Sequence, residues 1–304
     1  MEIAVPFRLE RFLYNICLVV ALFSIACSQS DPDSPTSSPN EPQSTEGAVT
    51  HLSLQFSAEV SGKAIQCGSV YHDVGLSQAT VEFADFRFYI NDIQLIDTDG
   101  HHTDVTLNEN SKWQYDNLVL LDFEDGTGLC ESGNPDLNTV VELDVPEGNY
   151  DGISFKFGVP FVHNHIDLSN APPPLSLTSM FWSWLDGYKF ARIEVGVTDG
   201  NPVVFPFHLG STGCTGWPEE GEVKSCSHEN LAHIELHGFD PSKNTIVFDY
   251  AALMAETDLK NAYGAPGCMS EFDDSDCPSI FEQLGLDFST GSQAASAQTV
   301  FHAK

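Results

Sequence analysis

The chain has 304 residues, and its 44 Asp and Glu against 12 Lys and Arg give a formal net charge of −32 at neutral pH. So acidic a surface argues against nucleic acid and anionic lipid surfaces as partners and favours cations or basic proteins. Once the N-terminal segments described next are set aside, the remaining length suits one large all-β domain.

The N-terminus carries the pattern of an export signal. Residues 12–26 (FLYNICLVVALFSIA) are apolar and follow Arg8 and Arg11. Because the run is too short for an ordinary membrane span, we interpret residues 1–26 as a signal peptide. Its end, Ser-Ile-Ala before Cys27, resembles a bacterial lipobox, which implies cleavage before Cys27 and a lipid on its sulfur. The expected location is the cell envelope, as a periplasmic or outer-membrane lipoprotein; the alternative is a soluble secreted product.

A tether follows the signal. Residues 27–49 are rich in Ser, Pro, Asp and Glu. Such a segment cannot bury enough apolar surface to fold, so we expect a disordered linker. The folded domain is therefore expected over residues 50–304.

The dominant hydrophobic period in this domain is two, which is typical of half-buried strands. In "HLSLQFSAEV" (51–60), apolar residues alternate with polar ones. In "VEFADFRFYINDIQLI" (81–96) the alternation changes phase, which predicts a bulge or a bend. Short strands separated by frequent turn signals predict a β-sandwich or barrel. Further strands are expected in "NLVLLDF", "TVVELDV", "GISFKFGV", "YKFARIEVGV", "VVFPFHL", "LAHIELHGF" and "NTIVFDY".

Two segments near the C-terminus have helical features. "YAALMAETDLK" (250–260) places apolar residues at helical spacing, and "CPSIFEQLG" (277–285) has Pro near its start and Gly285 at its end. The last segment, "QTVFHA", is expected to add an edge strand. The predicted fold is thus all-β, a disulfide-stapled β-sandwich with one or two short helices near the C-terminus.

The number of cysteines supports the prediction of disulfides. Cys17 lies in the signal and Cys27 is the lipid candidate, which leaves an even number in an exported domain. Those six cysteines are Cys67, Cys130, Cys214, Cys226, Cys268 and Cys277. They allow many connectivities. Short closures favour Cys214–Cys226 and Cys268–Cys277, which leaves Cys67–Cys130. A thiolate metal site is the rival interpretation, but no CxxC spacing supports it and export opposes it.

The stretch "SMFWSWLDGYKFARIEV" (179–195) contains two of the four tryptophans, Trp182 and Trp184. In a strand, residues two apart share a face, so the two indoles would stand side by side. The ordinary interpretation is a buried aromatic pair in the core. An unmodified indole has only an N–H donor and no lone pair for a metal. A role in metal chemistry would therefore need a redox-active or modified ring.

Several segments, in order, resemble the MbnP family, whose members carry a WxW motif and a four-Cys motif; the copper proteins of the MopE and CorA type are more distant relatives. The resemblance covers the whole domain. It rests on "DFRFYINDIQL", "LDFEDGTGLC", "GVPFVHNH", "MFWSWLDGYKFARIE", "HLGSTGC" and "PGCMSEFDDSDCPSIFEQLGL". It implies an exported protein that binds copper after a partner di-haem enzyme, MbnH, related to bacterial cytochrome c peroxidases, oxidises one Trp to kynurenine. Here the oxidised residue would be Trp182 or Trp184.

Copper would also need protein ligands, and imidazole suits it once the thiols form disulfides. We rank His165, His208 and His228 first because they lie in or beside the family-like segments. His163 and His51 come next. "DTDGHHTD" resembles the start of a calcium loop but lacks its later ligands, so we interpret it as a polar turn.

Two other functions compete with copper binding. An acidic surface lipoprotein without metal would present loops to a partner, and the presence of a neighbouring di-haem gene would distinguish it from a copper protein. A polysaccharide hydrolase would use the two indoles as a sugar platform and would need a carboxylate pair nearby. The leading hypothesis makes the protein the substrate of an enzyme and not an enzyme itself.

Overall fold

The computed structural model describes residues 48–109, 112–131, 133–199, 203–217, 221–260 and 266–304. The chain divides into two units, Met1–Thr45 and Glu46–Lys304, and all described residues belong to the second. The predicted signal peptide, Cys27 and almost all of the tether lie outside the described residues. Within the described ranges, no helix combines the length and the apolar character that a membrane crossing requires.

The first sheet is built around β1 (Val49–Val60), which runs parallel to β18 and antiparallel to β9. Its order is β21-β18-β1-β9-β6, and β2 pairs with the end of β1. The expected C-terminal edge strand is present as β21. The other bounds are β2 (Lys63–Ala64), β6 (Thr106–Leu107), β9 (Val140–Pro146), β18 (Thr245–Asp249) and β21 (Phe301–Ala303).

The second sheet is built around the long strand β4 (Ala79–Asp97). The path β14-β13-β4-β10-β17 forms its main body, and β3, β5 and β8 also pair with β4. The other bounds are β3 (Val70–Val74), β5 (His102–Asp104), β7 (Gln114–Tyr115), β8 (Leu118–Asp122), β10 (Tyr150–Phe157), β13 (Ala191–Val197), β14 (Val203–Leu209) and β17 (Ala232–His237).

The predicted change of phase in β4 is confirmed at two places. Opposite β13, the register shifts between Glu194 and Val195, and opposite β10 it shifts between Ser154 and Lys156. Asp92 in the second region has a φ of 52°. Each bulge reverses which side chains point inward, so β4 contributes to the core along its whole length.

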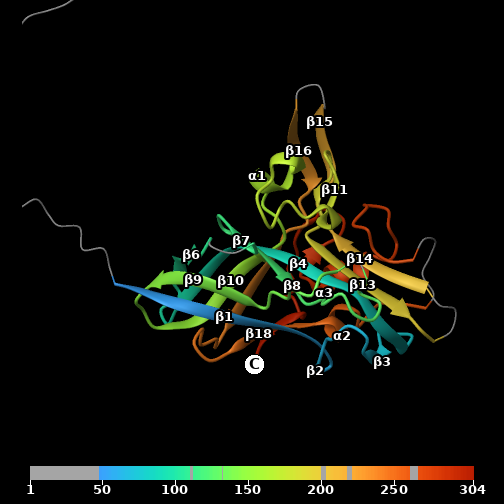
Figure 1. Ribbon diagram of the computed structural model, residues 1–304, viewed down its shortest axis with the longest axis horizontal. Helices are drawn as coiled ribbons and strands as arrows, with labels where there is room; N and C mark the ends of the chain where they lie inside the picture. Colours follow the sequence, from blue (N-terminus) through green and yellow to red (C-terminus); the bar gives the residue numbers. More distant parts are fainter. Residues whose placement is uncertain (1–47, 110–111, 132, 200–202, 218–220, 261–265) are drawn as a thin grey trace, which may run out of the picture. The chain divides into compact units, whose positions relative to one another are not determined.

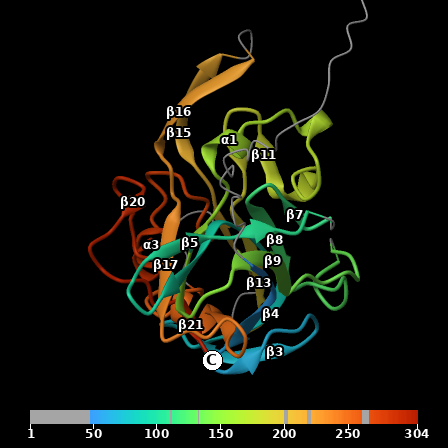
Figure 2. The same cartoon turned by 90° about the vertical axis from the view of Figure 1, so that its left-hand side faces the viewer.

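The core lies between the two sheets and is rich in phenylalanine. Phe88 of β4 packs on Phe248 of β18 at 5.4 Å between ring centroids, and Phe155 of β10 packs on Phe56 of β1 at 6.1 Å. Phe301 of β21 joins the same cluster. Figures 1 and 2 show the two sheets facing each other. The all-β sandwich predicted from the sequence is confirmed.

The short elements include both predicted helices. α2 (Tyr250–Leu253) is only one turn long, and α3 (Pro278–Gln283) ends just before Gly285, which has a φ of 72°. α1 (Phe161–Asn164) was not predicted. The remaining elements are η1 (Leu168–Asn170), η2 (Thr178–Met180), β11 (Phe181–Ser183), β12 (Gly187–Tyr188), β15 (Thr212–Trp217), β16 (Glu222–His228), β19 (Leu286–Asp287) and β20 (Ser292–Gln293).

Disulfides join Cys67 to Cys130, Cys214 to Cys226 and Cys268 to Cys277. These are the pairs that the short closures favour. The Cys214–Cys226 bridge crosses the β15–β16 hairpin, which stands away from the sandwich beside α1 and β11 (Figures 1 and 2). This end of the domain carries the tryptophan pair.

Candidate metal centre

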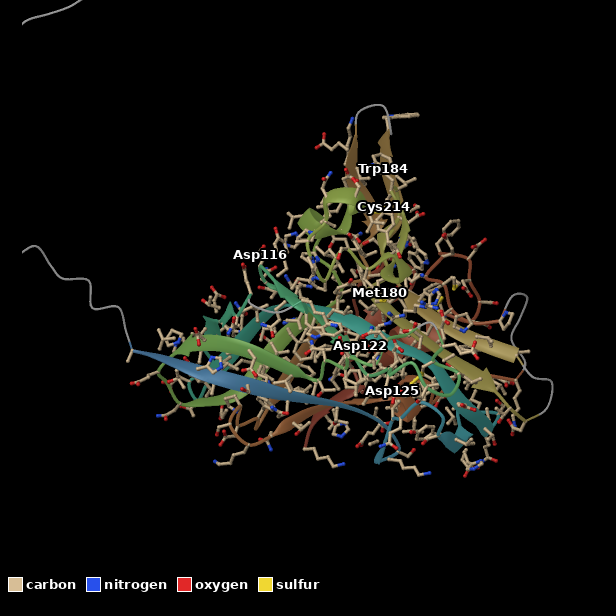
Figure 3. All side chains as sticks on the ribbon, in the orientation of Figure 1. Asp116, Asp122, Asp125, Met180, Trp184 and Cys214 are labelled. Carbon is tan, nitrogen blue, oxygen red and sulfur yellow. A yellow bond between two sulfur atoms is a disulfide. The ribbon has the colours of Figure 1, made fainter. Side chains whose placement is uncertain are left out.

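The tryptophan pair lies on a tight hairpin. β11 pairs with β12, and the intervening turn is closed by Ser183, whose hydroxyl donates to the Asp186 carboxylate at 2.6 Å and accepts from the Asp186 N–H at 3.0 Å. The strand ends at Ser183, so Trp184 already belongs to the turn. Both indoles are partly exposed, so the interpretation as a buried core pair is wrong. Figure 3 labels both Trp184 and Cys214 at the end of the domain that carries β15 and β16.

The Trp182 ring packs against His208 of β14. The two ring centroids are 6.2 Å apart and the rings are tilted by 56°. Gly210 makes this position available, because a Cβ there would lie 2.4 Å from Cζ3 of the indole. A glycine two residues after the histidine thus lets the indole lie over the end of β14.

His208 is a buried imidazole with one free nitrogen. Its Nε2–H donates to the Glu194 carboxylate at 2.7 Å, whereas Nδ1 is buried without a hydrogen-bond partner. Burial lowers the pKa of His208, and the neighbouring Glu194 only partly offsets this effect. The neutral ring with its proton on Nε2 therefore carries a lone pair on Nδ1, which is a metal-ligating atom.

Glu194 is fixed by a chain of ion pairs. Arg192 donates to Glu194 at 2.7 Å and contacts Asp85 at 3.1 Å, and Asp85 also pairs with the buried Arg87. Burial on its own would raise the pKa of Glu194, but hydrogen bonds from His208 and Arg192 outweigh it and hold this pKa at about 2. The segments "DFR", "ARIE" and "HLG", far apart in the sequence, meet in this chain of contacts.

His165 lies directly after α1, beside Cys226 of β16. Its Nε2 is 3.4 Å from Sγ of Cys226, and its ring packs on Phe161 at 5.0 Å between centroids. Its Nδ1 is buried without a partner of normal hydrogen-bond geometry. Burial lowers the pKa of His165, and the Trp184 backbone and the Asp186 carboxylate oppose this shift only in part.

The other predicted ligands are engaged elsewhere. His228 uses both ring nitrogens, Nδ1 with the Ser227 hydroxyl at 3.0 Å and Nε2 with the Ser289 carbonyl at 3.1 Å. His163 bonds Asp116 at 2.9 Å. His51 lies between Glu142 and Asp144, with a ring nitrogen bonded to each carboxylate.

The structure therefore brings two of the three top-ranked imidazoles to the tryptophan hairpin. His208 lies at Trp182, and His165 lies at the backbone of Trp184. Within the described ranges, three groups of His, Cys, Asp and Glu place their ligand atoms within 4.8 Å of one another. These groups are His165–Cys214–Cys226, Cys268–Asp274–Cys277 and Asp97–Asp99–His101. Only the first contains one of the three top-ranked histidines.

A surface pocket of about 270 Å³ opens beside Trp182. Burial, followed by the negative charges of Asp186, Asp273 and Asp274, raises the pKa of Glu271 in its wall. The pocket gives solvent and small molecules access to one side of the indole. Its lining consists of Trp182, Ser183, Asp186, Thr212, Met269 and Glu271.

Sequence reasoning missed two residues that build this site. Glu194 orients His208, but a single acidic residue in an alternating strand gives no signal of that role. Asn164 is fully buried, and its carbonyl oxygen accepts the Tyr188 N–H at 2.8 Å, which ties α1 to β12. Its place between His163 and His165 was the only available hint.

Comparisons with known proteins agree with this architecture. The MbnP family model matches residues 49–270. Among solved structures, MbnP from Methylosinus trichosporium superposes with a TM-score of 0.74 and 31% sequence identity, covering 84% of this chain and 98% of that protein. Comparison with the curated proteins found no match. The chain belongs to the MbnP family.

Proposed function

We propose that this protein binds copper after a partner di-haem enzyme of the MbnH type oxidises Trp182 to kynurenine. Membership of the MbnP family indicates a copper-related protein. In this proposal the protein is the substrate of the oxidising enzyme and has no catalytic role of its own. Export through the signal peptide and anchoring through Cys27 belong to the same proposal.

The observation that carries the proposal is the unpartnered Nδ1 of His208 beside the Trp182 ring. A buried nitrogen lone pair without a donor costs free energy unless a ligand satisfies it. The Glu194–His208 pair also has the form of a carboxylate–histidine–metal arrangement, in which the carboxylate fixes the tautomer and leaves the other nitrogen for the metal. Copper accepts imidazole nitrogen readily, so the donor set fits this metal.

Oxidation of the indole would add the donors that Trp lacks. Cleavage of the C2–C3 bond of the pyrrole ring with insertion of two oxygen atoms gives N-formylkynurenine; two molecules of hydrogen peroxide, used at the haem enzyme, supply these atoms and leave as water. Hydrolysis by one further water then releases the formyl group as formate and leaves an aromatic amine and a ketone. Trp182 is favoured over Trp184 because its ring lies against His208 and lines the accessible pocket.

The proposed protein ligands are His208, which contacts the Trp182 ring, and His165, which lies at the Trp184 backbone. His228 is left out because both of its ring nitrogens are already bonded. Glu194 would act on His208 as a positioning residue. The bound copper would be an ion that the protein can deliver. Burial of His208 would exclude water from one side of this ion.

The test is co-expression with the di-haem partner, followed by peptide mapping of residues 179–195 and copper titration. We expect kynurenine at position 182 in the wild type and in Trp184→Phe, and none in Trp182→Phe. His208→Ala should weaken copper binding of the oxidised protein by at least about tenfold, a loss seen even for outer-shell residues. His228→Ala is the matched control and should bind normally.

Two results would contradict the proposal. Tight stoichiometric copper binding by protein with two intact indoles would remove the need for oxidation. Modification at position 184 alone, with Trp182 unchanged, would assign the chemistry to the wrong indole. Wild-type binding by the Glu194→Gln variant would limit Glu194 to a structural role, because Gln can fill the space without accepting the same charge-assisted hydrogen bond.

A further inference from the structure

The β15–β16 hairpin carries a second set of metal-ligating atoms, which shares His165 with the proposed copper site but includes neither Trp182 nor His208. Nε2 of His165 and the sulfurs of Cys214 and Cys226 all lie within 4.8 Å of one another. The closest contact that involves the ring is 3.4 Å, from Nε2 to Sγ of Cys226. In the oxidised protein the two sulfurs are bonded to each other, so they cannot act as thiolate ligands.

We infer that reduction of Cys214–Cys226 converts this hairpin into a soft-metal site with one imidazole and two thiolate ligands. Two thiolates and an imidazole suit Cu(I), Zn(II) or Cd(II). The three residues come from α1's C-terminal side and from two directly paired strands, so the fold already holds them together. The inference does not depend on kynurenine, because no indole atom takes part.

Cys214–Cys226 is the most accessible of the three disulfides, as selective reduction requires. Cys214 and Cys226 are both partly exposed on a two-stranded hairpin outside the sandwich. By contrast, Cys268 and Cys277 are fully buried, and Cys67, although partly exposed, is bonded to the fully buried Cys130. Of the three bridges, Cys214–Cys226 alone has both cysteines partly exposed, so a dithiol reductant should reach it first.

The hairpin also tolerates the loss of its bridge. β15 and β16 pair over Thr212–Trp217 and Glu222–His228, and backbone hydrogen bonds join them on both sides of the cysteine pair. His228 at its base bonds the Ser289 carbonyl, and Asn230 donates to the Gly210 carbonyl at 2.7 Å. These contacts keep Cys214 and Cys226 near His165 after the S–S bond breaks.

The redox step balances with a dithiol as the reductant. Two electrons and two protons pass to the Cys214–Cys226 bond, which becomes two thiols, while the reductant closes its own disulfide. Metal binding then displaces the two thiol protons, because thiolates are the ligating form. A thioredoxin-like dithiol protein of the cell envelope is the class of reductant that would serve in the cell.

Nε2 of His165 faces the sulfurs, at 3.4 Å from Sγ of Cys226. It also accepts a hydrogen bond of 3.2 Å from the Asn164 amide, which a metal ion at Nε2 would displace. Asn164 is itself fixed by its bond with the Tyr188 N–H. The buried side chain of Asn164 therefore orients the His165 ring toward the Cys214–Cys226 disulfide.

The experiment uses the full protein, produced without the haem partner so that both indoles stay intact. Limited treatment with a dithiol, without denaturant, is followed by alkylation and peptide mapping. We expect labelled Cys214 and Cys226 and unlabelled Cys67, Cys130, Cys268 and Cys277. After removal of the reductant under anaerobic conditions, Cd(II) titration should give one equivalent bound with a sulfur-to-cadmium charge-transfer band.

Three arms decide the result. The unreduced protein should bind no Cd(II) with that band. Reduced His165→Ala should bind Cd(II) at least about tenfold more weakly, whereas reduced His237→Ala, at an exposed histidine of β17 outside the hairpin, should match the wild type. Cys214→Ser/Cys226→Ser should show no band, and circular dichroism of this variant checks that the sandwich is intact.

Several outcomes would overturn the inference. Labelling of all six cysteines at once would show that the bridge is not separately reducible. Selective reduction without a charge-transfer band, or equal Cd(II) affinity in reduced wild type and His165→Ala, would remove the site. Negative results in these experiments would not affect the kynurenine proposal. That proposal is tested with copper, on protein whose disulfides are intact and whose Trp182 has been oxidised.

Discussion

A group of buried charged side chains stands out at the level of single residues. Arg87, Asp85, Asp122 and Glu124 are almost completely buried. Arg87 of β4 pairs in register with Asp122 of β8, on the face of the second sheet opposite the phenylalanine core. One oxygen of Asp122 accepts the Glu124 N–H, and the other has no hydrogen-bond partner. Burial raises the pKa of Asp122 to about 7, and the negative charge of Glu124 acts in the same direction. Arg87 offsets these effects only in part.

This raised pKa predicts how stability depends on pH. Between about pH 4 and pH 7 the folded protein keeps the Asp122 proton while the unfolded chain has lost it, so the free energy of unfolding falls as pH rises. We expect Asp122→Asn to remove this penalty. The variant should match the wild type near pH 4 and should be more stable by about 2–4 kcal/mol near pH 8.

Urea unfolding at several pH values, with the disulfides intact, measures this difference. The comparison within one pair of proteins cancels the other carboxylates, such as Glu194, whose lowered pKa gives the opposite slope at acid pH. Parallel stability curves for the two proteins between pH 4 and pH 8 would show that Asp122 titrates normally in the folded state.

At the scale of elements, the tryptophan hairpin depends on a close approach between β12 and α1. Gly187 has a φ of 76°, and a Cβ at this position would lie 2.4 Å from the Asn164 carbonyl oxygen. The side-chain oxygen of Asn164 accepts the Tyr188 N–H. The tryptophan hairpin is therefore tied to the end of α1 by the close backbone approach at Gly187 and by this side-chain hydrogen bond.

We predict that Gly187→Ala destabilises the protein by about 1–3 kcal/mol and reduces oxidation of Trp182, because both the left-handed backbone and the contact with α1 oppose a side chain. Gly238→Ala is the matched control. Gly238 has a similar φ of 68°, but a Cβ there would meet nothing within 4 Å. Urea unfolding and peptide mapping measure the two effects; equal losses in both variants would assign the cost to φ alone.

The elements also show why the sequence predicts the fold better than the site. Alternation predicts the main strands of both sheets because inward side chains repeat every second residue, and the phase change in β4 is visible as its bulges. It does not predict the β15–β16 hairpin. Trp182 and Trp184 share that alternation in the sequence, but β11 ends at Ser183 because the Ser183–Asp186 turn closes there. No local pattern reports such a turn.

The ligand set was predictable only in part for a similar reason. His208 and His165 were ranked from their segments, whereas the choice against His228 depends on Ser289, 61 residues away in the sequence. Glu194 acquires its role only when β13 and β14 pair, which places it within reach of His208. Contacts across the sheet decide which imidazole keeps a free nitrogen.

For the whole molecule, the dominant property is the net charge of −32. The ion pairs include a buried set around Arg87 and several exposed ones, such as Lys112–Asp136 and Lys243–Asp240. Exposed pairs contribute little to stability, and the excess of negative charge destabilises the compact state through repulsion. Salt screens exposed charges more strongly than buried pairs.

We therefore predict that added salt stabilises the protein. As the ionic strength rises from about 0.01 M to about 0.15 M, the screening length falls from about 30 Å to about 8 Å, which weakens long-range repulsion more than the short buried pairs. The free energy of unfolding in urea should rise on the order of 1–2 kcal/mol, the size of a few surface charge interactions. NaCl and KCl should act alike, because screening depends on ionic strength. A rise with CaCl₂ alone would instead indicate specific cation binding, and a fall with NaCl would mean that attractive pairs outweigh the excess negative charge.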